Sequence, residues 1–166
     1  MIPNITYERL REVVSYNPLT GKFTWLVSLG SRAVKGQLTS QKVNTDGYHI
    51  FRIDKKLYYA HILAWFYMTS EWPKEFIDHK DTIRSNNIWE NLREATRQQN
   101  YRNTPARNKL KVKGVSQIRN RFYATITLNR VSVKLGSFST LEEAQNAYRE
   151  AALKYHGEFA HESLRV

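Results

Sequence analysis

A segment without hydrophobic periodicity, from Thr104 to Lys113, divides this chain into two parts with different patterning. The segment contains Pro105 and four basic residues, which favours a linker over a helix or strand. On both sides of it apolar residues recur at regular spacings, so each side can bury a core of its own. We therefore predict an α+β protein with a domain over residues 1–103, a basic linker over 104–113 and a second domain over 114–166.

Before the linker, short helical and strand patterns alternate. Asn17 to Gly21 is a turn, and the segment from Gly30 to Gly47 is polar and rich in turn residues, which indicates a loop. The predicted elements are a helix over 6–15 capped by Thr6, a strand over 22–26, a hairpin of 48–53 and 57–60, a helix over 61–69, strands ending at 79 and covering 92–95, and a helix from Thr96.

Beyond the linker, apolar residues alternate with period two from Phe122 to Leu128, and again from Val131 after an Asn129-Arg130 turn. Residues 115–120 form a plausible third strand. A capping box, Thr140 to Glu143, opens a helix that closes near Gly157. We expect a three-stranded antiparallel sheet with this helix across its apolar face. The other face would then expose Ser116, Tyr123, Thr125, Thr127, Ser132 and Lys134.

Composition narrows the classes of function. The chain has no cysteine, which excludes disulfides, Cys-based zinc sites and a thiol nucleophile, so any metal must have O and N ligands. No apolar stretch is long enough to cross a bilayer, and Met1 to Asn4 does not resemble a signal peptide. We therefore expect an intracellular protein. The formal charge of +11 predicts a polyanionic partner, most commonly nucleic acid.

The positive charge is concentrated in one part of the chain. From Ala95 to Leu141 there is no acidic residue, which predicts a continuous phosphate-facing track. Arg119, Arg121 and Arg130, at the strand ends, are candidates for DNA contact. Arg93 and Arg97, with Arg84, could clamp phosphates, and a solvated surface role has equal weight for them.

Asp78, His79, Asn91 and Asn100 form the constellation that can carry chemistry. A carboxylate and a carboxamide on either side of a strand-to-helix turn, Asp78 and Asn100, offer two hard oxygen ligands to Mg²⁺. His79 could deprotonate a water molecule beside a phosphorus atom. Asn91 could hold either the histidine or the intervening loop in position. His61, at the start of an apolar helix, is better interpreted as a structural histidine.

At these residues the chain resembles the HNH endonuclease family, in its phage and intron homing branch. The residues that carry the resemblance are Ile77-Asp78-His79, Asn86 to Arg93 and Ala95 to Asn100, with Tyr16 to Trp25 and Tyr58 to Trp65 upstream. The resemblance implies a ββα-metal unit, with Asp78 and Asn100 as ligands of a divalent ion, Mg²⁺ or Mn²⁺. It also implies His79 as general base, Asn91 as the central motif residue and a phage or mobile element as the source.

The C-terminal part resembles a second family, the AP2 DNA-binding domain. Lys113-Gly114-Val115, Tyr123 to Ile126, Lys134 to Phe138, Glu142 to Ala144 and Ala147 to Ala152 carry this resemblance. In that family the sheet enters the major groove of DNA. By motif position the DNA-facing residues would be Ser116, Ile118, Thr125, Thr127, Ser132 and Lys134.

The sequence therefore predicts a metal-dependent endonuclease acting on double-stranded DNA, homing-type or nicking. One active site per chain favours nicking unless two chains cooperate, and a monomer is compatible with this. Two other interpretations stay open. One is a DNA-binding regulator on a degenerate nuclease scaffold, and the other is an RNA-binding protein that uses the same basic track.

Overall fold

The computed structural model describes residues 5–104, 106, 108–161 and 164. The chain forms two compact units, Met1–Arg97 and Gln98–Val166, each with its own core. Both units mix helices with antiparallel strands, which confirms the predicted α+β class. Pro105 and Arg107 of the predicted linker lie outside the described residues, and the domain boundaries stay predictions.

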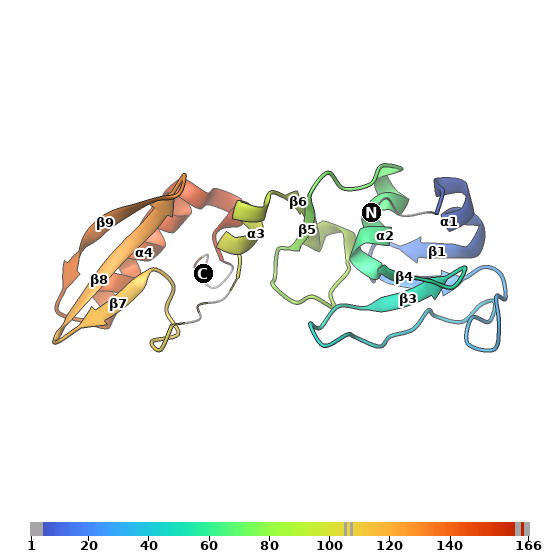
Figure 1. Ribbon diagram of the computed structural model, residues 1–166, viewed down its shortest axis with the longest axis horizontal. Helices are drawn as coiled ribbons and strands as arrows, with labels where there is room; N and C mark the ends of the chain where they lie inside the picture. The colour runs from blue at the N-terminus through green and yellow to red at the C-terminus, as the bar shows by residue number, and fades with distance from the viewer. Residues whose placement is uncertain (1–4, 105, 107, 162–163, 165–166) are drawn as a thin grey trace. The chain divides into compact units, whose positions relative to one another are not determined.

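In its described part, the first unit contains three antiparallel two-stranded sheets, pairing β1 with β2, β3 with β4 and β5 with β6 (Figure 1). A short helix, α3, follows the last strand and crosses the boundary between the units. The elements are α1 Tyr7–Val13, β1 Val14–Asn17, β2 Lys22–Trp25, β3 Ile50–Ile53, β4 Lys56–Tyr59, α2 Ala60–Thr69, β5 Phe76–His79, the 3-10 turn η1 Trp89–Asn91, β6 Leu92–Ala95 and α3 Arg97–Arg102.

Local sequence explains most of these elements. The Thr6 hydroxyl accepts a hydrogen bond from the Arg9 amide at 3.2 Å, which confirms Thr6 as the cap of α1. The helix is shorter than predicted, because Val14 leaves it to pair with Trp25 in the β1–β2 sheet. Asp54 and Lys55 have φ of 49° and 66°, the left-handed pair that a tight two-residue hairpin requires.

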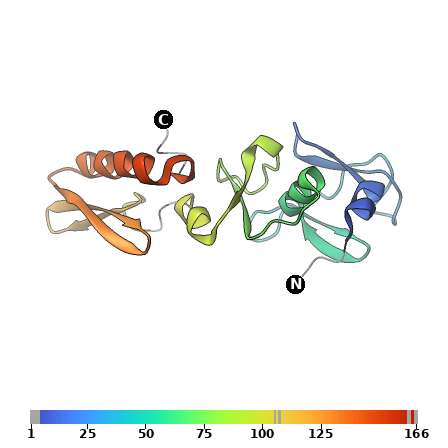
Figure 2. The ribbon, with the colours of Figure 1, turned by 90° about the horizontal axis from the view of Figure 1, so that it is seen from above.

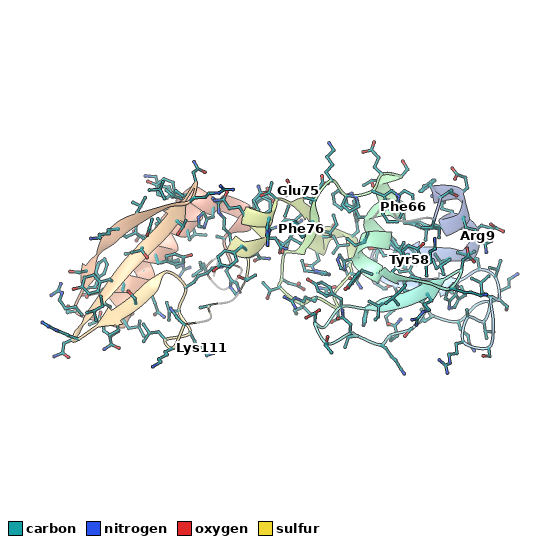
Figure 3. All side chains as sticks on the ribbon, viewed as in Figure 1. Arg9, Tyr58, Phe66, Glu75, Phe76 and Lys111 are labelled. Carbon is teal, nitrogen blue, oxygen red and sulfur yellow. The ribbon has the colours of Figure 1, made fainter. Side chains whose placement is uncertain are left out.

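Aromatic residues dominate the core of the first unit. The Phe23 ring lies 4.8 Å from that of Tyr16 and 5.3 Å from that of Phe51, measured between ring centroids. Phe66 on α2 stacks on Trp72 at 4.0 Å. Tyr58 and Phe66, both labelled in Figure 3, are buried members of this core. The hairpin bearing Asp78 and His79 is attached to the core through Ile77 and Leu92.

The second unit is a three-stranded antiparallel sheet in the order β7-β8-β9, with α4 across one face (Figures 1 and 2). Thr140 and Glu143 form the predicted capping box, and the helix ends at Gly157. The elements are β7 Val115–Ile118, β8 Arg121–Leu128, β9 Val131–Phe138, α4 Leu141–His156 and the 3-10 turn η2 Gly157–Phe159.

Small side chains fill the core of the second unit. Ala124, Ala144 and Ala152 are fully buried, which lets α4 lie close to the sheet. Gly114, with φ of +70°, is required where the chain enters the sheet, because a Cβ there would lie 2.0 Å from the ring of Tyr148. The sheet face covered by α4 is therefore closely packed, and the polar residues are left to the other face.

Candidate active site

The β5–β6 hairpin places the two central motif residues. In its register Asp78 lies opposite Arg93 and His79 lies opposite Leu92. Consecutive residues of a strand point to opposite faces, so Asp78 and His79 point away from one another. Both side chains are buried, with 6% and 4% of their surface exposed. Each is therefore held by neighbours from other elements.

Arg93 forms a buried ion pair with Asp78. Its Nε and Nη2 atoms donate to Asp78 Oδ2 at 2.9 Å and 2.7 Å. Of the two roles considered from the sequence, a phosphate clamp or a solvated surface residue, the burial of Arg93 contradicts the second. A buried carboxylate requires a partner charge, and Arg93 supplies it. Arg93 therefore fixes the orientation of Asp78.

His79 is oriented by Asn87, a residue to which the sequence assigned no role. His79 Nε2 lies 3.1 Å from Asn87 Oδ1, and Asn87 Nδ2 lies 3.4 Å from Nδ1 of His49. Because an amide oxygen can only accept, Nε2 carries the proton in this arrangement, and the lone pair of the neutral ring is on Nδ1. Burial is the main cause that lowers the pKa of His79 below its usual range, so the ring is neutral at pH 7.

Asn87 is itself anchored by the turn between β1 and β2. The Tyr16 hydroxyl donates to the Asn87 carbonyl at 2.6 Å. Gly21, with φ of +67°, packs against the Asn87 backbone so closely that a Cβ would lie 2.4 Å from its carbonyl carbon. Nearby, the Trp89 amide donates to the Pro18 carbonyl at 2.9 Å. The β1–β2 hairpin therefore fixes Asn87, and Asn87 in turn fixes the ring of His79.

Asn91 closes the loop between β5 and β6. Its Nδ2 donates to Asp81 Oδ1 at 2.9 Å and to the Asn86 carbonyl at 2.8 Å, and its Oδ1 accepts from the Asp81 amide at 3.0 Å. Of the two roles considered from the sequence, holding the histidine or holding the loop, these contacts match the second. The contact to the histidine belongs to Asn87.

His61 lies in an aromatic cluster beside His79. Its ring centroid is 4.8 Å from that of Tyr48, 5.6 Å from that of Tyr59 and 5.1 Å from that of His79. Burial lowers the pKa of His61 to about 3, and its Nδ1 finds no hydrogen-bond partner among the residues that the structure describes. A neutral, packed ring of this kind matches the structural role expected from the sequence.

The two residues that could hold a metal ion are in different units. Asp78 is in the first unit, whereas Asn100 is on α3 in the second, and their pairing stays a prediction. Among the described residues, no group of three or more His, Asp or Glu side chains could hold an ion. One carboxylate and one carboxamide nevertheless fit a hard cation that keeps most of its water.

Arg97, another predicted phosphate contact beside the motif, lies at the start of α3. Its amide donates to the Glu75 carboxylate, labelled in Figure 3, at 3.1 Å, and its side chain is exposed.

The sheet of the second unit brings the predicted DNA-facing residues together. Cross-strand pairs join Ser116 with Tyr123, Thr125 with Lys134 and Thr127 with Ser132. The register shifts between Ala124 and Thr125, so that Thr125 pairs with Lys134 and Ala124 with Gly136. Leu135 is the extra residue of this β-bulge. Arg119 and Arg130 are exposed in the two turns, and Arg121 donates to the Ser137 carbonyl at 2.9 Å. Tyr123, Thr125 and Thr127 alternate with the buried Ala124 and Ile126, so they and their strand partners lie on the face that α4 leaves uncovered.

Taken in chain order, a hairpin with Asp-His at the end of its first strand is followed by a short helix. This is the strand, strand, helix order expected of a ββα nuclease unit. Residues 58–102 match the model of the HNH endonuclease family. The chain is also 34% identical over 86 residues to an uncharacterised HNH endonuclease of Acanthamoeba polyphaga mimivirus. That alignment covers 51% of this chain and 45% of the relative, so the chain spans less than half of the relative's length.

Residues 58–102 of the chain are thus similar to HNH endonucleases, a family of phosphodiester hydrolases. The resemblance of the second unit to AP2 domains stays a prediction. Its sheet and helix have the arrangement that this resemblance implies. Within the described residues, no helix combines the length and the apolar character needed to cross a membrane.

Proposed function

We propose that this chain hydrolyses phosphodiester bonds in double-stranded DNA, as a homing-type or nicking endonuclease. The observation that carries the proposal is a neutral histidine, His79, whose ring is fixed through Nε2 by the buried Asn87. A general base must be unprotonated and oriented before the substrate arrives, and both conditions are met here.

In the proposed reaction His79 acts on the attacking water. Its Nδ1 lone pair takes a proton as the water oxygen bonds to phosphorus and the bond from phosphorus to the 3′ oxygen breaks, with the electron pair leaving on that oxygen. A general base of this kind contributes about 10²-fold to 10⁴-fold in rate. Asn91 keeps the β5–β6 loop closed around the histidine through its contacts with Asp81.

Asp78 and Asn100 are the proposed ligands of a divalent ion, Mg²⁺ or Mn²⁺. When bound, such an ion neutralises charge on the scissile phosphate and on the leaving oxygen. Arg93 positions the Asp78 carboxylate through two hydrogen bonds to Oδ2. Its contribution to the reaction is thus to orient a ligand.

The second domain, proposed as residues 114–166 after the 104–113 linker, holds the duplex. Its uncovered sheet face presents a cation, hydroxyl groups and Tyr123, and its turns present Arg119 and Arg130. Arginine and lysine contacts to phosphates provide affinity, whereas base edges provide sequence information. The proposed contact residues are Arg97, Ser116, Arg119, Arg121, Tyr123, Thr125, Thr127, Arg130, Ser132 and Lys134.

One observation favours the alternative, a DNA-binding regulator without cleavage. Arg93 already neutralises Asp78 in a buried pair, which lowers the attraction of that carboxylate for a second cation. The two functions differ in whether bound DNA is cut when a divalent ion is added.

The test is conversion of supercoiled plasmid to open-circle or linear DNA, with Mg²⁺, with Mn²⁺ and with chelator. We expect metal-dependent conversion by the native chain and its loss in His79→Ala. His161→Ala, a histidine outside the motif, is the matched control and should cut normally. Open circles as the main product would establish nicking.

Binding of a labelled duplex to the same variants, with RNA of the same sequence as competitor, separates the rival functions. The proposal expects His79→Ala to bind DNA as tightly as the native chain. Tight DNA binding without cleavage of plasmid or genomic DNA in either metal would favour the regulator. Stronger competition by RNA than by DNA at matched salt would favour the RNA-binding function.

A further inference from the structure

A groove in the first unit lies outside the site described above. It has a volume of about 1020 Å³ and is formed between the loop after β2 and the β3–β4 hairpin. Trp25 and Phe51 lie at its base, with their rings in an edge-to-face contact at 5.9 Å. Both rings are buried core members, so the base of the groove is a fixed part of the fold.

Four cations line the groove from both sides. Arg32 and Lys42 come from the loop, and Arg52 and Lys55 from the hairpin. All four are exposed, and within the described part of the chain none of them forms an ion pair. Like charges that converge without a counter-charge raise the local positive potential, which attracts an anionic partner.

The acidic residue among the described lining residues is already engaged. Asp54 accepts hydrogen bonds from Nε and Nη2 of Arg9 at 3.0 Å and 2.9 Å. Arg9, labelled on α1 in Figure 3, therefore neutralises the carboxylate that would otherwise oppose an anion. The four groove cations keep their full effect on a ligand.

The β3–β4 hairpin connects the groove with the aromatic cluster beside His79. Arg52 pairs with Leu57 and Ile50 pairs with Tyr59, and alternate residues of a strand share a face. The Tyr59 ring lies 5.6 Å from His61, and the His61 ring lies 5.1 Å from His79. An extended anion in the groove would thus follow the hairpin toward the histidine that is proposed to cut it.

We propose that this groove binds the phosphate backbone of duplex DNA, as a contact of the first unit separate from the sheet of the second. The proposal rests on the proposed function for the identity of the polyanion. It assigns a binding role to Arg32, Lys42, Arg52 and Lys55, all outside the acid-free stretch that suggested DNA binding in the sequence. The first unit, which carries the proposed general base His79, would then contact DNA independently of the second unit.

The test is the salt dependence of duplex binding by the full chain, in a His79→Ala background so that the probe stays intact. Each phosphate contact contributes about 0.9 to the slope of log affinity against log salt concentration. The double variant Lys42→Gln with Arg52→Gln should therefore lower the slope by about 1.8. Lys22→Gln with Lys74→Gln is the matched control, because both side chains are exposed in the same unit and neither lines the groove.

Equal slopes for the groove variant and the control would overturn the proposal. So would a loss confined to RNA of the same sequence, since the proposed occupant is duplex DNA. Tryptophan fluorescence on heating verifies that both double variants stay folded. Failure of the native chain to cut plasmid or genomic DNA in either metal would count against the proposed function and leave the slope difference standing, so the two failures are distinguishable.

Discussion

The two units differ in where they place their polar side chains. In the first unit Asp78, His79, Asn87 and Arg93 are buried, and all four are held by side-chain hydrogen bonds, Arg93 to Asp78 and His79 to Asn87. In the second unit the sheet residues predicted to face DNA lie on the face that α4 leaves uncovered. Buried polar groups acquire a fixed orientation and perturbed ionisation, whereas exposed ones stay hydrated and adaptable. The first arrangement suits chemistry, and the second suits binding.

The comparison predicts that polar substitutions destabilise the first unit far more than the second. Arg93→Met should have the largest effect, because it deprives the buried Asp78 carboxylate of both guanidinium hydrogen bonds. Removing one partner of a buried ion pair costs about 3–5 kcal/mol. Tryptophan fluorescence during urea unfolding measures this loss selectively, since all four tryptophans of the chain lie in the first unit.

Arg32→Met, a surface arginine of the same unit, is the control for Arg93→Met and should stay within about 0.5 kcal/mol of the native chain. A double variant, Asp78→Leu with Arg93→Met, should recover part of the lost stability, because no charge is then buried. A loss below about 1 kcal/mol in Arg93→Met would contradict the contrast between the units.

We expect an effect of intermediate size from His61, on how the stability of the first unit depends on pH. Its pKa of about 3 in the folded chain lies below the value near 6.5 of an unfolded histidine. The unfolded chain therefore binds the proton first as pH falls from about 6.5 toward 3, and stability drops by up to about 1.4 kcal/mol per pH unit. His61→Phe removes one titrating proton, so it should reduce the dependence of the unfolding free energy on pH by up to about 1.4 kcal/mol per pH unit. Urea unfolding between pH 4 and pH 7 measures this.

His79 is buried and titrates in the same direction, so some acid sensitivity will remain in His61→Phe. His161→Ala changes a histidine of the second unit. It should not alter how the free energy of unfolding of the first unit, followed by tryptophan fluorescence, depends on pH. An unaltered slope in His61→Phe would mean that His61 is solvated and titrates normally in the folded chain.

The smallest stability effect is expected on the uncovered sheet face. Lys134→Ala should change the free energy of unfolding by no more than about 0.5 kcal/mol, because the side chain is exposed. It should nevertheless lower the salt slope of duplex binding by about 0.9, the loss of one phosphate contact. Lys154→Ala, on α4 in the same unit, is the matched control and should keep the native slope. Equal slopes in the two variants would remove this face from the DNA interface.

Most of the element pattern could be predicted from local sequence. The turns at Asp54-Lys55 and Asn129-Arg130, the cap at Thr6 and the capping box from Thr140 each involve residues within a few positions of one another. Hydrophobic alternation from Phe122 correctly assigned Ala124 and Ile126 to the buried face. One strand, β1, was missed, because Val14 and Ser15 were assigned to the preceding helix and strand pairing prevailed over the helical pattern there. The other errors were at element boundaries.

The partners inside the candidate site could not be predicted in this way. Arg93 resembles a surface arginine in sequence, and its burial follows from the register that places it opposite Asp78. Asn87 stands beside Asn86 in a polar loop, with no periodicity to distinguish them. The only available signal was its position within the segment that resembles the HNH family.

The sequence by itself determined the α+β class, the two hydrophobic patterns and the excess of positive charge, and it predicted the candidate set Asp78, His79, Asn91 and Asn100. Only the tertiary structure decided that Asn87 orients His79, that Arg93 pairs with Asp78 and that four cations converge on a groove. The physical reason is the separation in sequence between the residues that contact one another. Caps, turns and periodicity act between neighbours, whereas the Tyr16 contact that anchors Asn87 spans 71 positions and the His49 contact spans 38. Contacts of that separation exist only once the core has packed.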